Sequence, residues 1–248
     1  MRRLKITLSY DGTDYCGWQV QPGLPTIQGT LETVLGEIEG RPVDVAGSGR
    51  TDAGVHALAQ VAACTLANPI PAPNLKKALN RLLPGDIRVL SVEEAAPDFH
   101  PRFQARAKTY EYRLWRGEVC PPFERRYLYH FPYPLNEEHF IAAAPVFAGE
   151  HDFSAFAASD ERDAQGGSKV RTVFESRAWR DGERLFYRVR GSGFLKHMVR
   201  NLAGALLEAG KGNRTAEDIR ALLEPGAAGK AAPAAPARGL FLLGVEYD

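Results

Sequence analysis

RLKITLSY, residues 3–10, is the stretch from which the fold is predicted. Leu4, Ile6, Leu8 and Tyr10 alternate with polar residues, and this period of two is typical of a half-buried β-strand. The segments that follow it predict helices as well as strands.

After this strand the apolar residues recur at helical spacing from Ile27 to Ile38, with Thr26 as N-cap and Gly40 as the stop. Three strands and one more helix are predicted in the first half: strands 43–46 and 58–66, a helix over 75–83 ended by Pro84-Gly85, and strand 87–95. The order β-α-β-β-α-β is that of a ferredoxin-like unit.

The rest of the chain repeats this order. Its first predicted elements are strand 105–116, a helix starting near Asn136 and a hairpin of 170–180 and 184–190. An apolar stripe over 195–206 predicts a helix that ends at Gly210, and a short helix over 215–223 and strand 240–247 follow. We therefore predict an α+β fold. Two ferredoxin-like halves, residues 1–100 and 101–248, would form a largely antiparallel sheet with helices on one side and a central cleft. The Pro/Ala/Gly-rich residues 225–238 are expected to form an extended, poorly packed lead-in to the last strand.

Composition indicates a globular protein, with 44% hydrophobic and 25% charged residues. Cys16, Cys64 and Cys120 are too few and too scattered for a disulfide framework, so we expect free thiols. No signal peptide or membrane segment is found in the sequence, which predicts a cytoplasmic location.

Basic residues are concentrated in two stretches, although the net charge is only +1. Residues 99–130 contain seven Arg or Lys against three acids, and residues 184–207 contain five and no acid. Such segregation is compatible with a nucleic-acid surface and, equally, with an ordinary solvated face.

The loop AGSGRTDAGVHA, residues 46–57, is the most unusual stretch of the first half. It lacks G-x-G-x-x-G and P-loop spacing, and a strand rather than a helix follows it, which argues against phosphate binding. The scattered histidines argue against zinc, and no G-x-S-x-G elbow is present for a serine hydrolase. What remains is Asp52 with Arg50 two residues away. By themselves these two residues predict a structural ion pair bracing a turn more readily than a reactive carboxylate.

Several stretches together resemble the tRNA pseudouridine synthase A (TruA) family, and they occur in the family's order. They are GRTDAGVHA (49–57), YDGTDYCGWQ (10–19), IQGTLE (27–32), FH (99–100) leading into AKTYEY (107–112), EHDFSAF (150–156), VRT (170–172), GFLKHMVRNLAG (193–204) and GLFL (239–242). The resemblance covers essentially the whole chain. Residues 157–168 and the tract before Gly239 depart from the family pattern, which puts loop contacts in doubt.

The resemblance implies an isomerase that converts uridine to pseudouridine at positions 38, 39 and 40 of the tRNA anticodon stem-loop. It implies no cofactor and no metal, and a homodimer in which one tRNA contacts both subunits. The cleft between the halves would then be catalytic.

Residue roles follow from the same resemblance. Asp52 is the nucleophile that attacks the ribose or the base, or it takes part in proton abstraction at the sugar. Tyr110 stacks on the uracil and serves in C5 deprotonation, and Arg200 is the basic partner of Asp52. Arg50 occupies the vacated space or guides the flipped nucleotide, and His56 and Lys196 also bind substrate. Without the motif, Tyr110 would be read as a core aromatic.

Two other function classes remain open from the residues alone. A non-catalytic ferredoxin-like RNA-binding protein would need no aspartate in a glycine-rich loop. A small-molecule α+β enzyme is disfavoured by the basic stretches.

Overall fold

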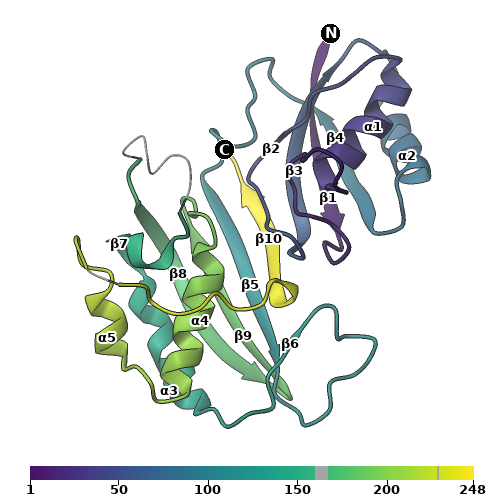
Figure 1. The fold of residues 1–248 in the computed structure, drawn as a ribbon. Helices are drawn as coiled ribbons and strands as arrows, with labels where there is room; N and C mark the ends of the chain where they lie inside the picture. Colours follow the sequence, from purple (N-terminus) through teal and green to yellow (C-terminus); the bar gives the residue numbers. More distant parts are fainter. Residues whose placement is uncertain (160–166, 228) are drawn as a thin grey trace. The chain divides into compact units, whose positions relative to one another are not determined.

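The computed structural model describes residues 1–159, 167–227 and 229–248 (Figure 1). The chain forms two compact units, one of Met1–Arg106 with Phe241–Asp248 and one of Ala107–Leu240. Both mix helices with mostly antiparallel strands, so the predicted α+β class is confirmed. The predicted halves 1–100 and 101–248 stay a prediction about domains. By packing, the last strand belongs with the first unit.

The first unit contains β1 (Arg2–Tyr10), α1 (Ile27–Glu39), β2 (Ala46–Gly47), β3 (His56–Leu66), α2 (Ala72–Leu82), β4 (Ile87–Glu94) and β10 (Leu240–Glu246). Strand β1 pairs antiparallel with both β3 and β4. Strand β3 also pairs antiparallel with β2 and parallel with β10. This order within the unit is that of interleaved split β-α-β units, as the element order predicts.

Local sequence explains the first elements. Leu4, Ile6 and Leu8 are completely buried along β1, as their alternation predicts. The Thr26 side chain accepts a hydrogen bond from the Gly29 N–H at the start of α1, and Gly40 ends that helix in a left-handed conformation. Helices α1 and α2 lie side by side in Figure 1.

The second unit contains β5 (Ala107–Trp115), β6 (Tyr129–His130), α3 (Glu137–Ala143), β7 (Gly149–Asp152), β8 (Val170–Asp181), β9 (Arg184–Gly191), α4 (Met198–Gly210) and α5 (Ala216–Ala221). Strands β5, β9, β8 and β7 pair antiparallel in that order. The side chains of Leu185, Tyr187 and Val189 on β9 are buried. Tyr187 packs against Phe147 just after α3, at a ring-centroid distance of 6.3 Å.

The structure differs from the predicted elements in several places. Of the predicted strand 43–46 only Ala46 is paired, together with Gly47 after it, because α1 takes the polar groups of Val45: Glu32 accepts its N–H and Gln28 donates to its carbonyl. Strand β7 was not predicted, because GEHD has no apolar alternation. Helix α4 begins at Met198 rather than 195, since His197 has a left-handed backbone with φ 60°.

The Pro/Ala/Gly-rich tract is also better packed than expected. Ala231 and Ala235 are buried, and their N–H groups donate to the carbonyls of Ala155 and Arg200 at 3.0 Å each. The Tyr112 hydroxyl donates to the Pro236 carbonyl at 2.8 Å. Small side chains let this backbone lie close to its neighbours. Residue 228, and residues 160–166 of the divergent loop 157–168, lie outside the described part of the chain.

No helix in the described ranges is long and apolar enough to cross a membrane. All three cysteines have free thiols, as expected.

Candidate functional site

The loop 46–57 ends in a tight turn that places Asp52. The Val55 N–H donates to the Asp52 carbonyl at 3.1 Å, and Gly54 between them has φ 75°. A positive φ at the third residue of a four-residue turn is the geometry for which glycine is favoured. The glycine of the TDAG sequence is therefore required by the turn that presents Asp52.

Segment 10–18 supports this loop from the side. The Trp18 N–H donates to the Thr51 carbonyl at 3.0 Å, and the Gly54 N–H donates to the Tyr15 carbonyl at 3.4 Å. The sequence marked this segment as part of the family pattern but gave it no role. The structure shows that it holds the backbone on both sides of Asp52.

A buried polar network lies beneath the same loop. Gln60 and Ser48 are completely buried, and the Ser48 hydroxyl donates to the Gln60 side-chain oxygen at 2.5 Å. The Tyr10 hydroxyl lies 2.9 Å from the Thr51 hydroxyl. Burial raises the pKa of Tyr10 to about 12, so this phenol is neutral at physiological pH. None of these four residues was predicted as a site residue.

Arg50 and Asp52 do not form the structural ion pair that their spacing suggests. The Arg50 side chain is exposed, and among the described residues its guanidinium has no hydrogen-bond or ion-pair partner. Asp52 is half-buried. Arg50 is thus available to a ligand, while the residues on both sides of it are held in place.

His56, predicted to bind substrate, lies in the core beneath the loop. It is 1% exposed, and its ring stacks on Phe241 at a centroid distance of 4.7 Å. Its Nδ1 lies 3.2 Å from the Gly12 nitrogen and 3.1 Å from an Asp11 oxygen.

The second unit carries Tyr110, Lys196 and Arg200. Tyr110 lies on β5, is 8% exposed, and meets Phe194 edge to face at 5.2 Å. Lys196 is exposed, and its Nζ donates to the Ser159 carbonyl at 3.3 Å. Arg200, on the first turn of α4, donates from Nε to the Ala235 carbonyl at 2.8 Å.

The structure thus gathers Arg50, Asp52 and His56 in the first unit, and Tyr110, Lys196 and Arg200 in the second. No cluster of His, Cys, Asp or Glu that could hold a metal is found within residues 1–159, 167–227 and 229–248.

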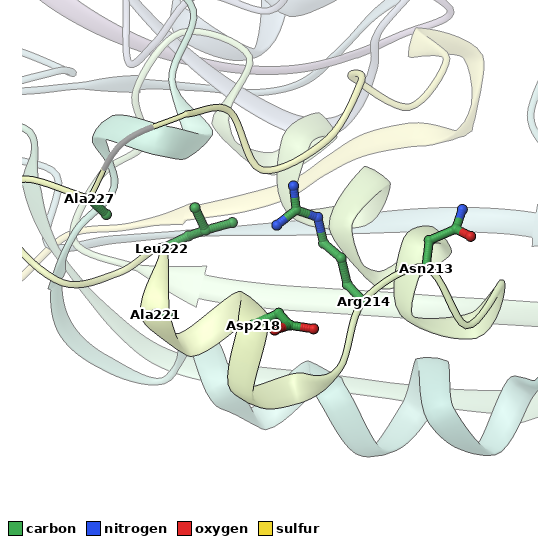
Figure 2. A pocket seen from close by; sticks show the side chains of 6 residues that line it. All are labelled: Asn213, Arg214, Asp218, Ala221, Leu222 and Ala227. Atoms are coloured by element: carbon green, nitrogen blue, oxygen red, sulfur yellow. The ribbon is translucent and has the colours of Figure 1, made fainter.

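A surface depression of ≈ 550 Å³ lies elsewhere, beside α5 (Figure 2). Its lining residues are Asn213, Arg214, Asp218, Ala221, Leu222 and Ala227. None of the predicted site residues lines it. Asp218 is engaged in the capping box of α5 with Thr215, which accounts for its position there.

Comparison with known proteins gives the class and then the family. The family model of tRNA pseudouridine synthase matches residues 6–104 and 143–248. The chain is 62% identical over 247 residues to tRNA pseudouridine synthase A of Solibacter usitatus, with 100% of both chains covered. It is 44% identical to the protein of the same name from Limosilactobacillus fermentum, covering 100% of this chain and 97% of that one. It is 43% identical to that from Anoxybacillus flavithermus, with both fully covered.

These matches define an RNA-modifying isomerase. The chain belongs to the tRNA pseudouridine synthase family, as its motifs predict.

Proposed function

We propose that this protein isomerises uridine to pseudouridine at positions 38, 39 and 40 of the tRNA anticodon stem-loop, with Asp52 as its nucleophile. The observation that carries the residue assignment is the loop itself. Its backbone is fixed on both sides of Asp52, while the neighbouring Arg50 stays exposed without a partner among the described residues.

The reaction breaks the N1–C1′ glycosidic bond and joins C1′ to C5 of the same base. The proton at C5 is lost and N1 gains one, so the reaction is balanced without an oxidant, a reductant or a second substrate. A hydrolase needs a second carboxylate to act on water or on the leaving group. Here the base is retained, and one carboxylate acting on the ribose or the base is sufficient. We accordingly propose that neither a cofactor nor a metal takes part.

The other site residues receive roles that fit their surroundings. A paired base must first leave its stack, which requires a few kcal/mol. Arg50, exposed beside Asp52, is suited to fill the vacated space. Tyr110 offers its ring to the uracil and its hydroxyl to the C5 proton. We propose Arg200 as the basic partner of Asp52, and exposed Lys196 as a phosphate contact.

His56 takes a different role from the one predicted. Because its side chain is 1% exposed and bonded to Gly12, we propose that it supports the loop rather than touching the RNA.

The test is to incubate transcribed tRNA carrying uridine at positions 38 to 40 with wild type, Asp52→Asn and Asp44→Asn, and to map pseudouridine chemically. Asp44 is an exposed carboxylate eight residues away and serves as the matched control. We expect product with wild type and Asp44→Asn, and none with Asp52→Asn. No product from wild type would overturn the proposed activity, whereas full activity of Asp52→Asn would overturn only the role of Asp52.

The same samples distinguish the proposed enzyme from the alternative, a non-catalytic RNA-binding protein. Asp52→Asn is expected to bind tRNA as wild type does, with an affinity that falls steeply as salt rises. Binding without any product from wild type would favour the alternative.

We further propose that two copies associate, in the cytoplasm where tRNA is found. Support comes from the face of β8 and β9 opposite the buried Tyr187. There Trp179 stacks on Phe186 at 5.1 Å, with Arg177 and Arg188 each 5.0 Å from the Trp179 ring. Stacked aromatic residues with arginines are characteristic of protein interfaces.

Both signs of charge occur on this side of the sheet. Buried Glu111 of the neighbouring β5 accepts from Arg188 at 2.6 Å and from Arg113 at 2.9 Å, and Glu175 pairs with Arg177 at 2.6 Å. A face bearing both signs can be complementary to a second copy of itself, as a two-fold interface requires.

A further inference from the structure

The Gln60 side chain uses its whole hydrogen-bonding capacity inside the first unit. Its oxygen accepts from the Ser48 hydroxyl at 2.5 Å and from the Val61 N–H at 3.1 Å. Its NH₂ group donates to the Gly49 carbonyl at 3.1 Å and to the Tyr10 hydroxyl at 3.5 Å. An amide offers two acceptor lone pairs and two N–H donors. A completely buried amide with four partners is rigidly oriented.

These bonds reach the loop on both sides of Arg50. Gly49, directly before Arg50, is held by Gln60 itself. Thr51, directly after it, is held by Tyr10, whose oxygen accepts from Gln60 and whose proton is therefore available to Thr51 at 2.9 Å. Asp52 directly follows the segment that these hydrogen bonds hold.

We propose that Gln60 is a positioning residue for the reaction: through Gly49, Ser48 and the Tyr10–Thr51 pair it fixes the backbone from which Arg50 and Asp52 project. The inference rests on the proposed function, since it concerns the placement of the proposed nucleophile. A reacting group misplaced by about 1 Å can lose on the order of 10²-fold in rate. Binding of the tRNA body, which depends on surface cations, is not expected to depend on this amide.

The first experiment compares Gln60→Leu with Asn80→Leu. Asn80 is a matched control: its side chain links α2 to β4 through two hydrogen bonds with Val89 and does not contact the loop. Rates at saturating tRNA, tRNA Kd and Tm are measured for both. We expect Gln60→Leu to lower kcat on the order of 10- to 100-fold with a Kd within about twofold of wild type. Asn80→Leu should lower Tm but leave kcat within about twofold.

A second variant keeps the test decisive if Gln60→Leu does not fold. In Gln60→Glu, an ionised carboxylate faces the Gly49 carbonyl without a proton to donate, whereas the protonated acid can donate one. Burial raises the pKa of such a carboxyl, so the acid form returns as the pH is lowered. We expect the kcat of Gln60→Glu, relative to wild type at the same pH, to recover as pH falls.

Three outcomes would overturn the inference while leaving the proposed activity intact. The first is a wild-type kcat in both Gln60 variants. The second is a loss of activity that matches the unfolded fraction, and the third is a raised Kd with unchanged kcat. An inactive wild type would instead overturn the proposed function.

Discussion

At the scale of single residues, Arg50 is the side chain whose change should affect function without affecting the fold. It is exposed and has no partner among the described residues, so its removal leaves no buried group unsatisfied. We predict that Arg50→Ala lowers kcat/KM by roughly 10- to 100-fold, the loss of a few kcal/mol of help in base flipping. The Tm should stay within about 1 °C of wild type.

The control for this variant is Arg81→Ala, which removes an exposed arginine at the end of α2. Both steady-state kinetics and thermal unfolding are measured. Equal kinetic losses in the two variants would mean that general charge, not the position of Arg50, is responsible.

Only some residues of the proposed site can be identified from the sequence. The proposed roles of Asp52 and Arg50 come from a contiguous motif, although spacing alone favours an ion pair that the structure does not show. Gln60 carries no such signal, because it sits in a strand among small apolar residues. Its partners, Tyr10 and Ser48, come from separate segments, and the pairing of β3 with β1 and with β2 brings them to Gln60.

At the scale of elements, the contact between Gly47 and Trp18 fixes where β2 meets segment 10–18. A Cβ on Gly47 would lie 2.5 Å from the Trp18 ring, whereas one on Gly244 in β10 would meet nothing within 4 Å. We predict that Gly47→Ala destabilises the protein by about 1–3 kcal/mol through overpacking. Gly244→Ala, the matched control, should change stability by no more than about 0.5 kcal/mol.

Urea unfolding of both variants measures this difference as a shift of the midpoint at constant m-value. If Gly47→Ala were as stable as wild type, the Trp18 ring would have to be free to move. Its contact with Gly47 would then not fix β2 against segment 10–18.

Elements with clear periodicity are well predicted, as β1 and α1 show. Prediction fails where side chains, rather than a neighbouring strand, bond to the backbone N–H and carbonyl groups of a segment. Val43 and Val45 have the composition of a strand, but the N–H of Val45 is taken by Glu32 of α1. Periodicity cannot reveal such a substitution, because it depends on a neighbouring helix. Strand β7 is missed for a different reason: it pairs with β8 although its sequence has no alternation of apolar residues.

At the scale of the whole molecule, the Trp179 face is predicted to join two copies. Trp179→Asp places a charge among stacked aromatic residues and should convert a dimer into a monomer in sedimentation velocity. Phe123→Asp, at a side chain 93% exposed in the β5–β6 connection, is the control and should leave the dimer intact. A monomeric wild type, or a dimer lost only in Phe123→Asp, would refute this assignment.

The first unit takes its last strand from beyond the second unit. Phe241, which stacks on His56 beneath the loop, follows the whole of Ala107–Leu240 in the chain. During synthesis, the loop therefore lacks part of its support until β10 has left the ribosome. A chain that stalls before Phe241 would carry every proposed catalytic side chain and still lack this stacking contact. Synthesis of the second unit thus precedes completion of the first.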